Sequence, residues 1–527
     1  MGYYKDLREF VKALEKENLI YRITREINKD TELMPMVRWQ FRGLAEEKRK
    51  AFLFENVTDV KGRKYDIPVL VGVHAASTKI YAMAMMCGTE EIMKKWESAQ
   101  VSPIEPIMVE SGPVHEEVHM GETLLEHGGL EEIPVPISTP GYDNAPYYTA
   151  ANWVSKDPDT GIRNVGTYRS MVKSPTRLGI ACQFPQHLRM HWQRCKERGE
   201  SALEAALVIG PTPAVGLTSV SKIPYGTDEY AVAGGIAGEP IELVTCKTVD
   251  IEVPSTSEIV IEGEIPTDYL EREGPFGEHP GYVIGSGPNL PFNVRCITHR
   301  KNAIFCAFIS QFPPSESSKL RTIGRGATIY NFLKYECNLP NILDVVLHEN
   351  SGSSQFIVIR MKKRNNAEAW QALLTTTGFD PHMGKMVVAV DEDIDARDID
   401  AVIWALCYRM QPQNDIKVVP GKLHQTDPSA APPSAEGKLE RIPGSALLID
   451  ATMKWAYPPV SLPRREFMER AKQIWEEEGL PALTPKAPWH GYELGFWPAE
   501  SAEEAELALK GEYYRTGDKF AKTRLKL

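Results

Sequence analysis

The chain has 527 residues, of which 42% are hydrophobic and 25% charged, and its formal net charge is −11 at pH 7. This length is enough for about three domains with large cores, and the composition is that of an ordinary globular protein. Because an acidic surface does not attract polyanions, the charge argues against nonspecific binding to nucleic acid or anionic membranes. The N-terminus has no apolar signal segment and no apolar run is long enough to span a bilayer. We therefore expect a cytoplasmic protein without a membrane span.

The eight cysteines are spread along the chain without a C-x-x-C pair. This spacing predicts neither a disulfide framework nor a cysteine-based zinc site. Five of them lie in apolar or strand-like runs and are interpreted as small buried hydrophobic residues. These are Cys182, Cys246, Cys296, Cys306 and Cys407.

Residues 1–115 predict an N-terminal α/β domain. Apolar residues at helical spacing in 3–18 indicate an amphipathic helix, and shorter β-branched and aromatic runs indicate strands. The expected elements are helices at 3–18, 31–44 and 78–98 and strands at 51–57 and 69–73. Scattered prolines and glycines then predict an extended connection over 101–148.

Residues 116–314 are rich in strand patterns with few helices, which favours a barrel or sandwich of about 200 residues. Strands at 149–154 and 164–172 flank a turn at 157–161, and a helix is expected at about 186–198. Strands at 292–299 and 303–310, separated by Arg300-Lys301-Asn302, predict another hairpin.

From residue 315 helices and strands alternate again, which predicts a C-terminal α/β domain over 315–527. A hairpin is expected at 342–348 and 355–362, and a proline-rich loop at 427–434 precedes the strand 445–448. The helices near 465–478 and 502–509 are candidates for an oligomer contact.

The segment from Glu271 to Tyr282 combines three carboxylates, an Arg and a His with two prolines and three glycines. This density of Gly and Pro predicts a shaped loop rather than a helix or central strand. A loop of restricted geometry is a common support for an acid/base pair, here Glu273 and Glu278. On these residues alone, a solvated acidic turn is an equally good interpretation.

Other residues could carry chemistry, although P-loop, nucleophile-elbow, H-E-x-x-H and Rossmann signatures are missing. His187 and His191 are four apart on the expected helix and share a face, as zinc ligands often do, but no carboxylate lies between them. Arg169 on its strand suits either a surface ion pair or a clamp for a substrate carboxylate. Glu229 follows a turn and could cap a helix or bind a hard cation. The carboxylates in 258–264 alternate along a strand and are expected to face solvent.

Taken together and in order, these motifs resemble the UbiD-type decarboxylases, which include ferulic acid decarboxylase and the polyprenyl-hydroxybenzoate decarboxylases. The block from about 152 to 282 carries the resemblance, and each motif alone is modest. The matching positions are Asn164 to Arg169, Gln186-His187, Glu229, Glu273-Gly-Pro-Phe-Gly-Glu278, 242–246, 258–263 and 450–455.

The resemblance implies a mixed α/β fold in three parts: an N-terminal α/β unit, a central flavin-reductase-like split β-barrel and a C-terminal α/β oligomerisation domain. It also implies prenylated flavin mononucleotide (prenylated FMN) as cofactor, with Mn²⁺ or Mg²⁺ held by Asn164, His187 and Glu229. A K⁺ ion would lie beside it near 218–221, where this chain departs from the family pattern. The implied cofactor contacts are Asn164, Val165, Gly166, Thr167, Tyr168, Arg169, Gln186, His187 and Glu229, with Lys454 as a weak match.

The same resemblance implies that Arg169, Glu273 and Glu278 are catalytic. Arg169 would pair with Glu273 and steer the substrate carboxylate, while Glu278 donates a proton after CO₂ departs. We expect burial beside a second carboxylate to raise the pKa of Glu278. His279 suggests a substrate more polar than cinnamate. Arg321 and Arg325 could extend an anion-binding surface, with solvent exposure as the simpler expectation.

The implied partners are an aromatic or α,β-unsaturated carboxylic acid, CO₂, a flavin prenyltransferase that supplies the cofactor, and further copies of the chain. Three alternatives stay open at this point. They are a flavin oxidoreductase, a noncatalytic subunit of a carboxylase complex and a metal-dependent hydrolase built on His187 and His191.

Overall fold

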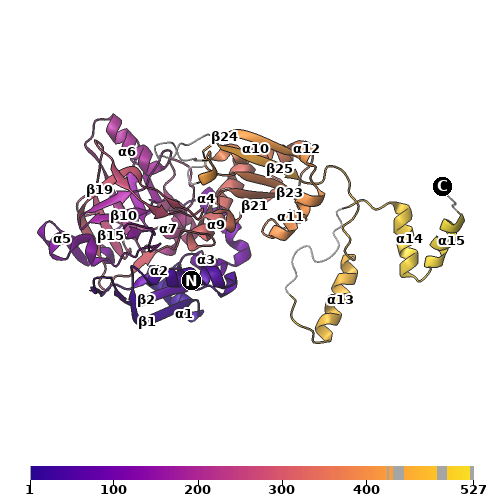
Figure 1. The fold of residues 1–527 in the computed structure, drawn as a ribbon, viewed down its shortest axis with the longest axis horizontal. Coiled ribbons are helices and arrows are strands. Elements are labelled where there is room, and N and C mark those ends of the chain that lie inside the picture. The colour runs from indigo at the N-terminus through magenta and orange to yellow at the C-terminus, as the bar shows by residue number, and fades with distance from the viewer. Residues whose placement is uncertain (1, 424–426, 431–443, 484–494, 523–527) are drawn as a thin grey trace.

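The computed structural model describes residues 2–423, 427–430, 444–483 and 495–522. The chain forms a large body with three main sheets, and the last helices extend away from it (Figure 1). The mixed helix-and-sheet class expected from the sequence is confirmed. No described helix is long and apolar enough to cross a membrane.

The N-terminal part begins with an amphipathic helix, α1, which buries Leu7, Phe10, Val11 and Leu14. The Asp6 side chain caps it by accepting from the Glu9 amide at 2.9 Å. The expected helix at 78–98 is two helices, because the chain turns at Met86 (φ 51°) before Gly88. The elements are α1 (Leu7–Lys16), β1 (Ile20–Asn28), α2 (Leu33–Gly43), β2 (Ala51–Thr58), β3 (Lys64–Tyr65), β4 (Val69–Val71), α3 (Thr78–Ala84) and α4 (Ile92–Val101).

The first sheet has the order β1-β2-β4-β20, with β3 beside β2. Its last strand, β20 (Phe305–Ala307), comes from more than two hundred residues later and pairs with β4 in parallel. The hairpin predicted over 292–310 is therefore wrong. The run 303–309 is buried along almost its whole length, and the N-terminal sheet supplies the partner that this apolar run requires.

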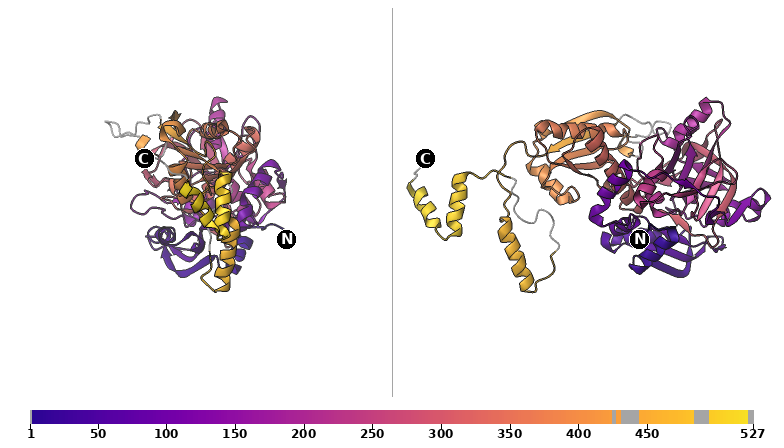
Figure 2. Two further views of the ribbon diagram at one scale, coloured as in Figure 1. Left: turned by 90° about the vertical axis from the view of Figure 1, so that its right-hand side faces the viewer. Right: turned by 180° about the vertical axis from the view of Figure 1, so that it is seen from behind.

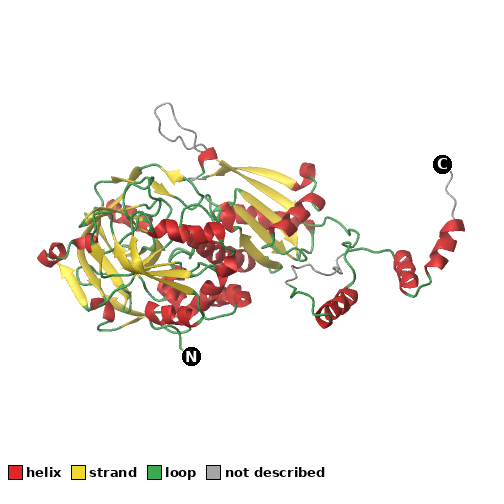
Figure 3. Ribbon diagram, turned by 60° about the horizontal axis from the view of Figure 1, so that its bottom comes forward, coloured by secondary structure: helices red, strands yellow, loops and turns green. Residues whose placement is uncertain are grey.

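The central part is a ten-stranded sheet with the main order β7-β10-β11-β19-β15-β12-β8-β9, while β16 and β6 pair with β19. Strands β9 and β10 lie towards opposite ends of this order yet are separated in sequence only by Tyr168 and Arg169. The sheet therefore curls so that its two ends approach each other (Figures 1 and 3). The sequence pattern predicted one strand at 164–172, and the break between these two strands is the correction.

The connection expected to be extended over 101–148 contains short elements of its own. The elements of the central part are β5 (Ile107–Met108), β6 (Glu117–Met120), α5 (Glu122–Glu126), the 3₁₀ turn η4 (Gly129–Glu132), β7 (Tyr147–Tyr148), β8 (Asn152–Lys156), β9 (Arg163–Thr167), β10 (Ser170–Ser174), β11 (Arg177–Ile180), α6 (His187–Glu197), β12 (Ala202–Ile209), α7 (Pro213–Thr218), α8 (Glu229–Ala237), β13 (Glu242–Thr245), β14 (Glu252–Pro254), β15 (Ile259–Pro266), β16 (Glu271–Glu273), β17 (Phe276–Gly277), β18 (Val283–Ile284) and β19 (Gly287–His299). One hydrophobic core runs through the N-terminal and central parts.

The C-terminal part is a five-stranded sheet of order β21-β22-β23-β25-β24, and the hairpin predicted over 342–362 is confirmed as β21 and β22. Two further core clusters accompany this sheet. The proline-rich loop predicted at 427–434 extends beyond the described residues, and Cys407, expected to be buried, is exposed. The elements are α9 (Glu316–Asn331), β21 (Ile342–Leu347), β22 (Phe356–Met361), α10 (Asn366–Phe379), β23 (Met386–Asp391), α11 (Ile399–Tyr408), α12 (Pro412–Asp415), β24 (Ile416–Lys422), β25 (Gly444–Ala451), α13 (Arg465–Glu477), α14 (Ala499–Leu509) and α15 (Tyr513–Lys522).

Glu258 is fully buried rather than facing solvent, as is Glu262. Arg8 of α1 donates from Nε and Nη2 to the two Glu258 carboxylate oxygens, both at 2.8 Å. The Ile304 amide donates to the same carboxylate at 3.0 Å. This ion pair joins the first helix to the central sheet, since a buried carboxylate requires such partners.

Replacing Glu258 with Ala should lower the free energy of unfolding by about 3 kcal/mol, because it leaves the guanidinium of Arg8 without its carboxylate partner. Glu264→Ala, on the strand that follows Glu258, is the matched control, since the pair of Glu264 with Arg295 is partly exposed and is worth less than about 1 kcal/mol. Urea unfolding followed by circular dichroism measures both. Equal losses in the two variants would contradict the assignment.

Candidate active site

A cavity of about 340 Å³ lies where the central sheet, the loop after β16 and helix α9 meet. This volume is within the range of about 300–1,000 Å³ that small-molecule sites occupy. Its wall combines residues of the central part, such as Arg169, His187 and Glu278, with residues of the C-terminal part, such as Arg321 and His382. The site therefore depends on the contact between these two parts.

Arg169 is placed by the break between β9 and β10. The neighbouring carbonyls are hydrogen-bonded: that of Tyr168 accepts from Trp153 Nε1 at 3.1 Å, and that of Arg169 accepts from the Ala181 amide at 3.1 Å. The guanidinium also lies over the ring of Phe276, 4.9 Å from its centroid. The break thus holds a largely buried guanidinium in one position at the cavity wall.

Glu273, at the end of β16, is the main partner of Arg169. Arg169 Nε donates to Glu273 Oε1 at 3.0 Å and Nη2 donates to Oε2 at 2.9 Å, a bidentate pair. Asn289 Nδ2 donates to the same carboxylate at 3.1 Å. Only 1% of Glu273 is exposed, so protein hydrogen-bond donors rather than water surround this carboxylate.

Glu278 accepts from Arg169 Nη1, and its second oxygen lies 3.2 Å from His279 Nδ1. Burial alone would raise the pKa of Glu278, but Arg169 and His279 bring it well below its ordinary value. The expected upward shift of this pKa is therefore wrong for the protein without ligands. Arg169 holds both carboxylates at once, which keeps Glu278 ionised in this state.

The loop that carries both carboxylates requires glycine at two positions. Gly274 has φ +93°, in the left-handed region, and its carbonyl accepts from Asn144 Nδ2 at 3.0 Å. A Cβ on Gly277 would lie 2.8 Å from side-chain atoms of Gln311 and Thr139. These contacts set the spacing between Glu273 and Glu278.

Asn164, His187 and Glu229 come together on the same cavity wall. His187 Nδ1 lies 3.1 Å from Asn164 Oδ1 and 4.0 Å from Glu229 Oε1, while the Val165 amide donates to Glu229 Oε2 at 2.8 Å. Burial raises the pKa of Glu229 to about 8, and burial together with Lys222 lowers the pKa of His187 to about 4. Among the described residues, Glu229 has no Lys or Arg ion-pair partner. A buried carboxylate of this kind, a neutral imidazole and an amide oxygen fit a divalent ion such as Mn²⁺ or Mg²⁺.

All but one of the residues expected to contact a flavin line this cavity: Asn164, Val165, Gly166, Thr167, Tyr168, Arg169, Gln186, His187 and Glu229. Ser219, in the segment expected near K⁺, also lines the cavity. Its carbonyl accepts a hydrogen bond from the Thr167 amide at 2.9 Å. Lys454 lies elsewhere. It lines a separate depression beside β25, and its Nζ donates to the carbonyls of Asp450 and Thr452, both at 2.7 Å.

Two arginines on α9 are the main residues of the site that the sequence placed wrongly. Arg321 and Arg325 line the cavity instead of facing solvent, and burial lowers the pKa of both, that of Arg325 to about 10. Arg321 Nη1 donates to Ser317 Oγ at 3.0 Å. Their i,i+4 spacing predicts that both side chains share one face of the helix. It does not predict whether this face lines a cavity or is exposed to solvent.

His191 is separated from the site although it shares a helix with His187. It is buried and its Nδ1 lies 2.9 Å from Ser155 Oγ, while His187 lines the cavity. The structure therefore does not bring the two histidines together as ligands of one ion, and the hydrolase alternative loses its basis.

Comparison with known proteins is consistent with this geometry. Three sequence models of 3-octaprenyl-4-hydroxybenzoate carboxy-lyase match the chain in order: the N-terminal domain at 11–100, the Rift-related domain at 107–312 and the C-terminal domain at 319–451. The chain belongs to the UbiD family. UbiD-family enzymes are decarboxylases, and this family member is accordingly a carboxy-lyase.

Several relatives of this UbiD-family chain are similar over most of their length. Anhydromevalonate phosphate decarboxylase of Methanothermobacter thermautotrophicus is 30% identical over 436 residues, covering 82% of this chain and 95% of the relative. A dimeric, evolved form of the UbiD-class enzyme HmfF from Pelotomaculum thermopropionicum, solved with prenylated FMN, has TM-score 0.75 and 29% identity and covers 89% of this chain and 100% of its own. Vanillic acid decarboxylase of Sedimentibacter hydroxybenzoicus has TM-score 0.75 and 26% identity, covering 97% and 99%.

Substituting His187 with Ala should abolish Mn²⁺ binding at the cavity wall, because it removes the nitrogen donor of the Asn164–His187–Glu229 set. His191→Ala should leave this Mn²⁺ binding unchanged, since its side chain contacts Ser155 instead. Titration followed by the electron paramagnetic resonance of free Mn²⁺ measures both. Loss of Mn²⁺ in both variants, or in neither, would contradict the assignment.

Proposed function

We propose that this protein catalyses the reversible, non-oxidative decarboxylation of an aromatic, heteroaromatic or α,β-unsaturated carboxylic acid with prenylated FMN. The observation that carries the proposal is the position of Arg169, which binds Glu273 and Glu278 at the wall of a cavity that also holds the Asn164–His187–Glu229 set. Loss of CO₂ from an sp² carbon leaves an electron pair that side chains cannot accept, and the prenylated flavin supplies the electron sink when bound.

Asn164, His187 and Glu229 would hold Mn²⁺ or Mg²⁺ against the cofactor phosphate, with K⁺ near Ser219 as a further proposed ion. The neutral imidazole of His187 is in the protonation state that a metal requires. The peptide groups of 164–169 lie along the cavity and would contact the flavin. A Cβ at Gly166 would lie 2.4 Å from the Tyr168 hydroxyl oxygen, so a residue with a side chain would not fit at this position.

Arg169 gives the two carboxylates different roles. A substrate carboxylate entering the cavity competes for Nη1, the nitrogen that binds Glu278, while the bidentate pair with Glu273 keeps the guanidinium in place. Loss of this ion pair removes the largest influence that lowers the pKa of Glu278, so its pKa rises and proton uptake becomes easier. Glu278 then donates this proton to the carbon that CO₂ leaves, and regains one from solvent.

The substrate end of the cavity is polar and cationic. His279 contacts Glu278 directly, and Arg321 and Arg325 add two guanidinium groups with few anionic partners nearby. An acid that carries a second anionic or hydroxyl group fits this surface better than a plain cinnamate. The similarity to an enzyme named for a phosphorylated acid supports the same class.

Two other functions are less well supported. A flavin oxidoreductase would require nicotinamide to bleach the bound flavin, and it gives no role to the ion-paired acid Glu278. A noncatalytic subunit would have no reason to bury Arg169, Glu273 and Glu278 together at a cavity.

We also propose that the chain is a homo-oligomer joined through its C-terminal helices. Helices α13, α14 and α15 stand away from the body and have no buried residues (Figures 1 and 2). They nevertheless expose large apolar side chains, including Phe467, Trp475 and Phe520, that a second copy would cover. Sedimentation of the purified chain tests this, and a monomeric mass would overturn it.

Production of the protein with and without a flavin prenyltransferase tests the function. Only after co-production do we expect a bound flavin with a modified absorption spectrum and CO₂ release from aromatic and unsaturated acids. Acids that bear a second anionic group should be preferred. Consumption of nicotinamide without CO₂ release would favour the oxidoreductase instead.

Glu278→Gln should lower the rate of CO₂ release by about a hundredfold or more and leave the flavin bound, because the amide cannot donate the proton. Glu271→Gln is the matched control: it lies in the same segment but pairs with Lys173 and Arg177, so its rate should stay near that of the wild type. Decarboxylation by Glu278→Gln at the wild-type rate would overturn the role of this acid.

A further inference from the structure

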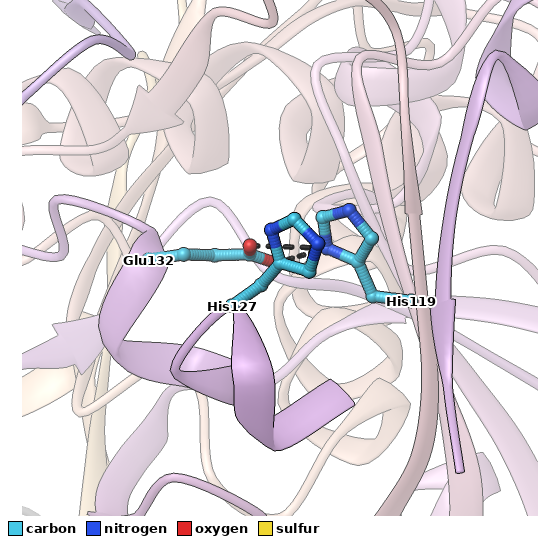
Figure 4. Close-up of side chains that lie close together, drawn as sticks. All are labelled: His119, His127 and Glu132. Carbon is cyan, nitrogen blue, oxygen red and sulfur yellow. Dashed lines mark hydrogen bonds and ion pairs between the residues drawn. The ribbon is translucent and has the colours of Figure 1, made fainter. Parts of the chain in front are cut away.

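A second group of potential ligands lies outside the cavity, where strand β6 pairs with β19 of the central sheet. His119 is on β6, His127 ends α5 as its C-cap residue, and Glu132 is the last residue of η4. The three side chains converge on one point (Figure 4). The proposed catalysis gives them no role, since the described cavity is lined by other residues.

The geometry brings two imidazoles and one carboxylate together. His119 Nδ1 lies 3.0 Å from Glu132 Oε2, and one potential ligand atom from each residue lies within 4.8 Å of the other two. The rings of His119 and His127 stack with centroids 3.8 Å apart and an angle of 6° between their planes. His299 packs edge-on against His119, which is buried, while His127 is exposed.

The backbone that carries the three residues is well supported. Strand β6 pairs with β19, and His119 faces Ile297 in this register. Gly128 and Gly129 have φ of +92° and +56°, and a Cβ on Gly129 would lie 2.3 Å from the Pro175 carbonyl oxygen, which accepts from the Leu130 amide at 2.8 Å. This Gly-Gly turn, which only glycine fits, reverses the chain between His127 and Glu132 and so sets their distance.

We propose that His119, His127 and Glu132 bind a divalent transition metal ion of the zinc class. Two imidazole nitrogens and one carboxylate oxygen are borderline ligands that suit Zn²⁺ or Co²⁺, and water completes a tetrahedral shell. Mg²⁺ and Ca²⁺ prefer shells made of oxygen alone. The site is structural: it fastens the connection between the N-terminal part and β7 onto strand β19.

Binding requires a small movement of one side chain. Ligand atoms about 2.1 Å from a tetrahedral ion are about 3.4 Å apart, which is within the present spread of this cluster. Two parallel ring planes cannot both contain the same ion, so one imidazole has to turn. His127 is exposed and free of the sheet, so it turns while His119 and Glu132 stay in place.

Titration of the chelator-treated full-length protein with Co²⁺ tests the site, because four-coordinate Co²⁺ absorbs strongly in the visible range. The wild type should show this absorption, and His127→Ala should weaken Co²⁺ binding here by about tenfold or more, since loss of even an outer-sphere partner costs about 10–100-fold. His127→Cys retains a ligand and should keep the site, with an added sulfur-to-Co²⁺ absorption band. Glu131→Gln, next to a ligand but exposed, should match the wild type.

The proposed metal site at the cavity is distinguished by His187→Ala, which should lose that ion and keep the four-coordinate Co²⁺ absorption. Zn²⁺ should also raise the melting temperature of the wild type more than that of His127→Ala, while CO₂ release by the loaded enzyme is the same in both. Four-coordinate Co²⁺ absorption that forms with wild-type affinity in His127→Ala, or that disappears in His187→Ala, would overturn the proposal.

Discussion

The bidentate ion pair between Arg169 and Glu273 is the interaction on which the site depends. A buried guanidinium is tolerated only with well-placed partners, and here a strand break supplies the position while Glu273 and Asn289 complete the hydrogen bonding. Because Glu273 occupies two donors of Arg169, one nitrogen is left for Glu278 or for a substrate carboxylate. In the proposed mechanism, this single cation would couple substrate arrival to the protonation of Glu278.

The curled central sheet also carries part of the proposed metal site. Asn164 lies on β9, His187 begins α6 and Glu229 begins α8, so three elements far apart in the sequence end at one wall. Asp228, next to Glu229, caps α8 through the Tyr230 amide and pairs with Arg163. The neighbouring carboxylates thus serve different purposes, one as a helix cap and the other as a donor towards the cavity.

Local patterns in the sequence predicted many elements of the fold, including α1, α6 and the β21–β22 hairpin, because helical periodicity and turn residues act over short distances. They did not predict that β20 joins the N-terminal sheet or that 164–172 is broken, since both depend on partners far along the chain. The positions of Arg321 and Arg325 were missed for the same reason. Their spacing places them on one face of a helix, but it does not show that this face lines a cavity. The domain limits at 115 and 314, the ion sites and the residue roles stay predictions. The low pKa of Glu278 was not predicted, because it follows from an ion pair with Arg169 that sequence spacing does not reveal.

The placement of β20 has a consequence for the way the chain folds. The N-terminal sheet is complete only after residues 305–307 have been synthesised. Until then, the edge of β4 that pairs with β20 has no strand partner. Contacts of such long sequence separation slow folding and expose unpaired strand edges to aggregation. The first hundred residues match a family model of their own, yet their sheet and hydrophobic core are completed by residues of the central part.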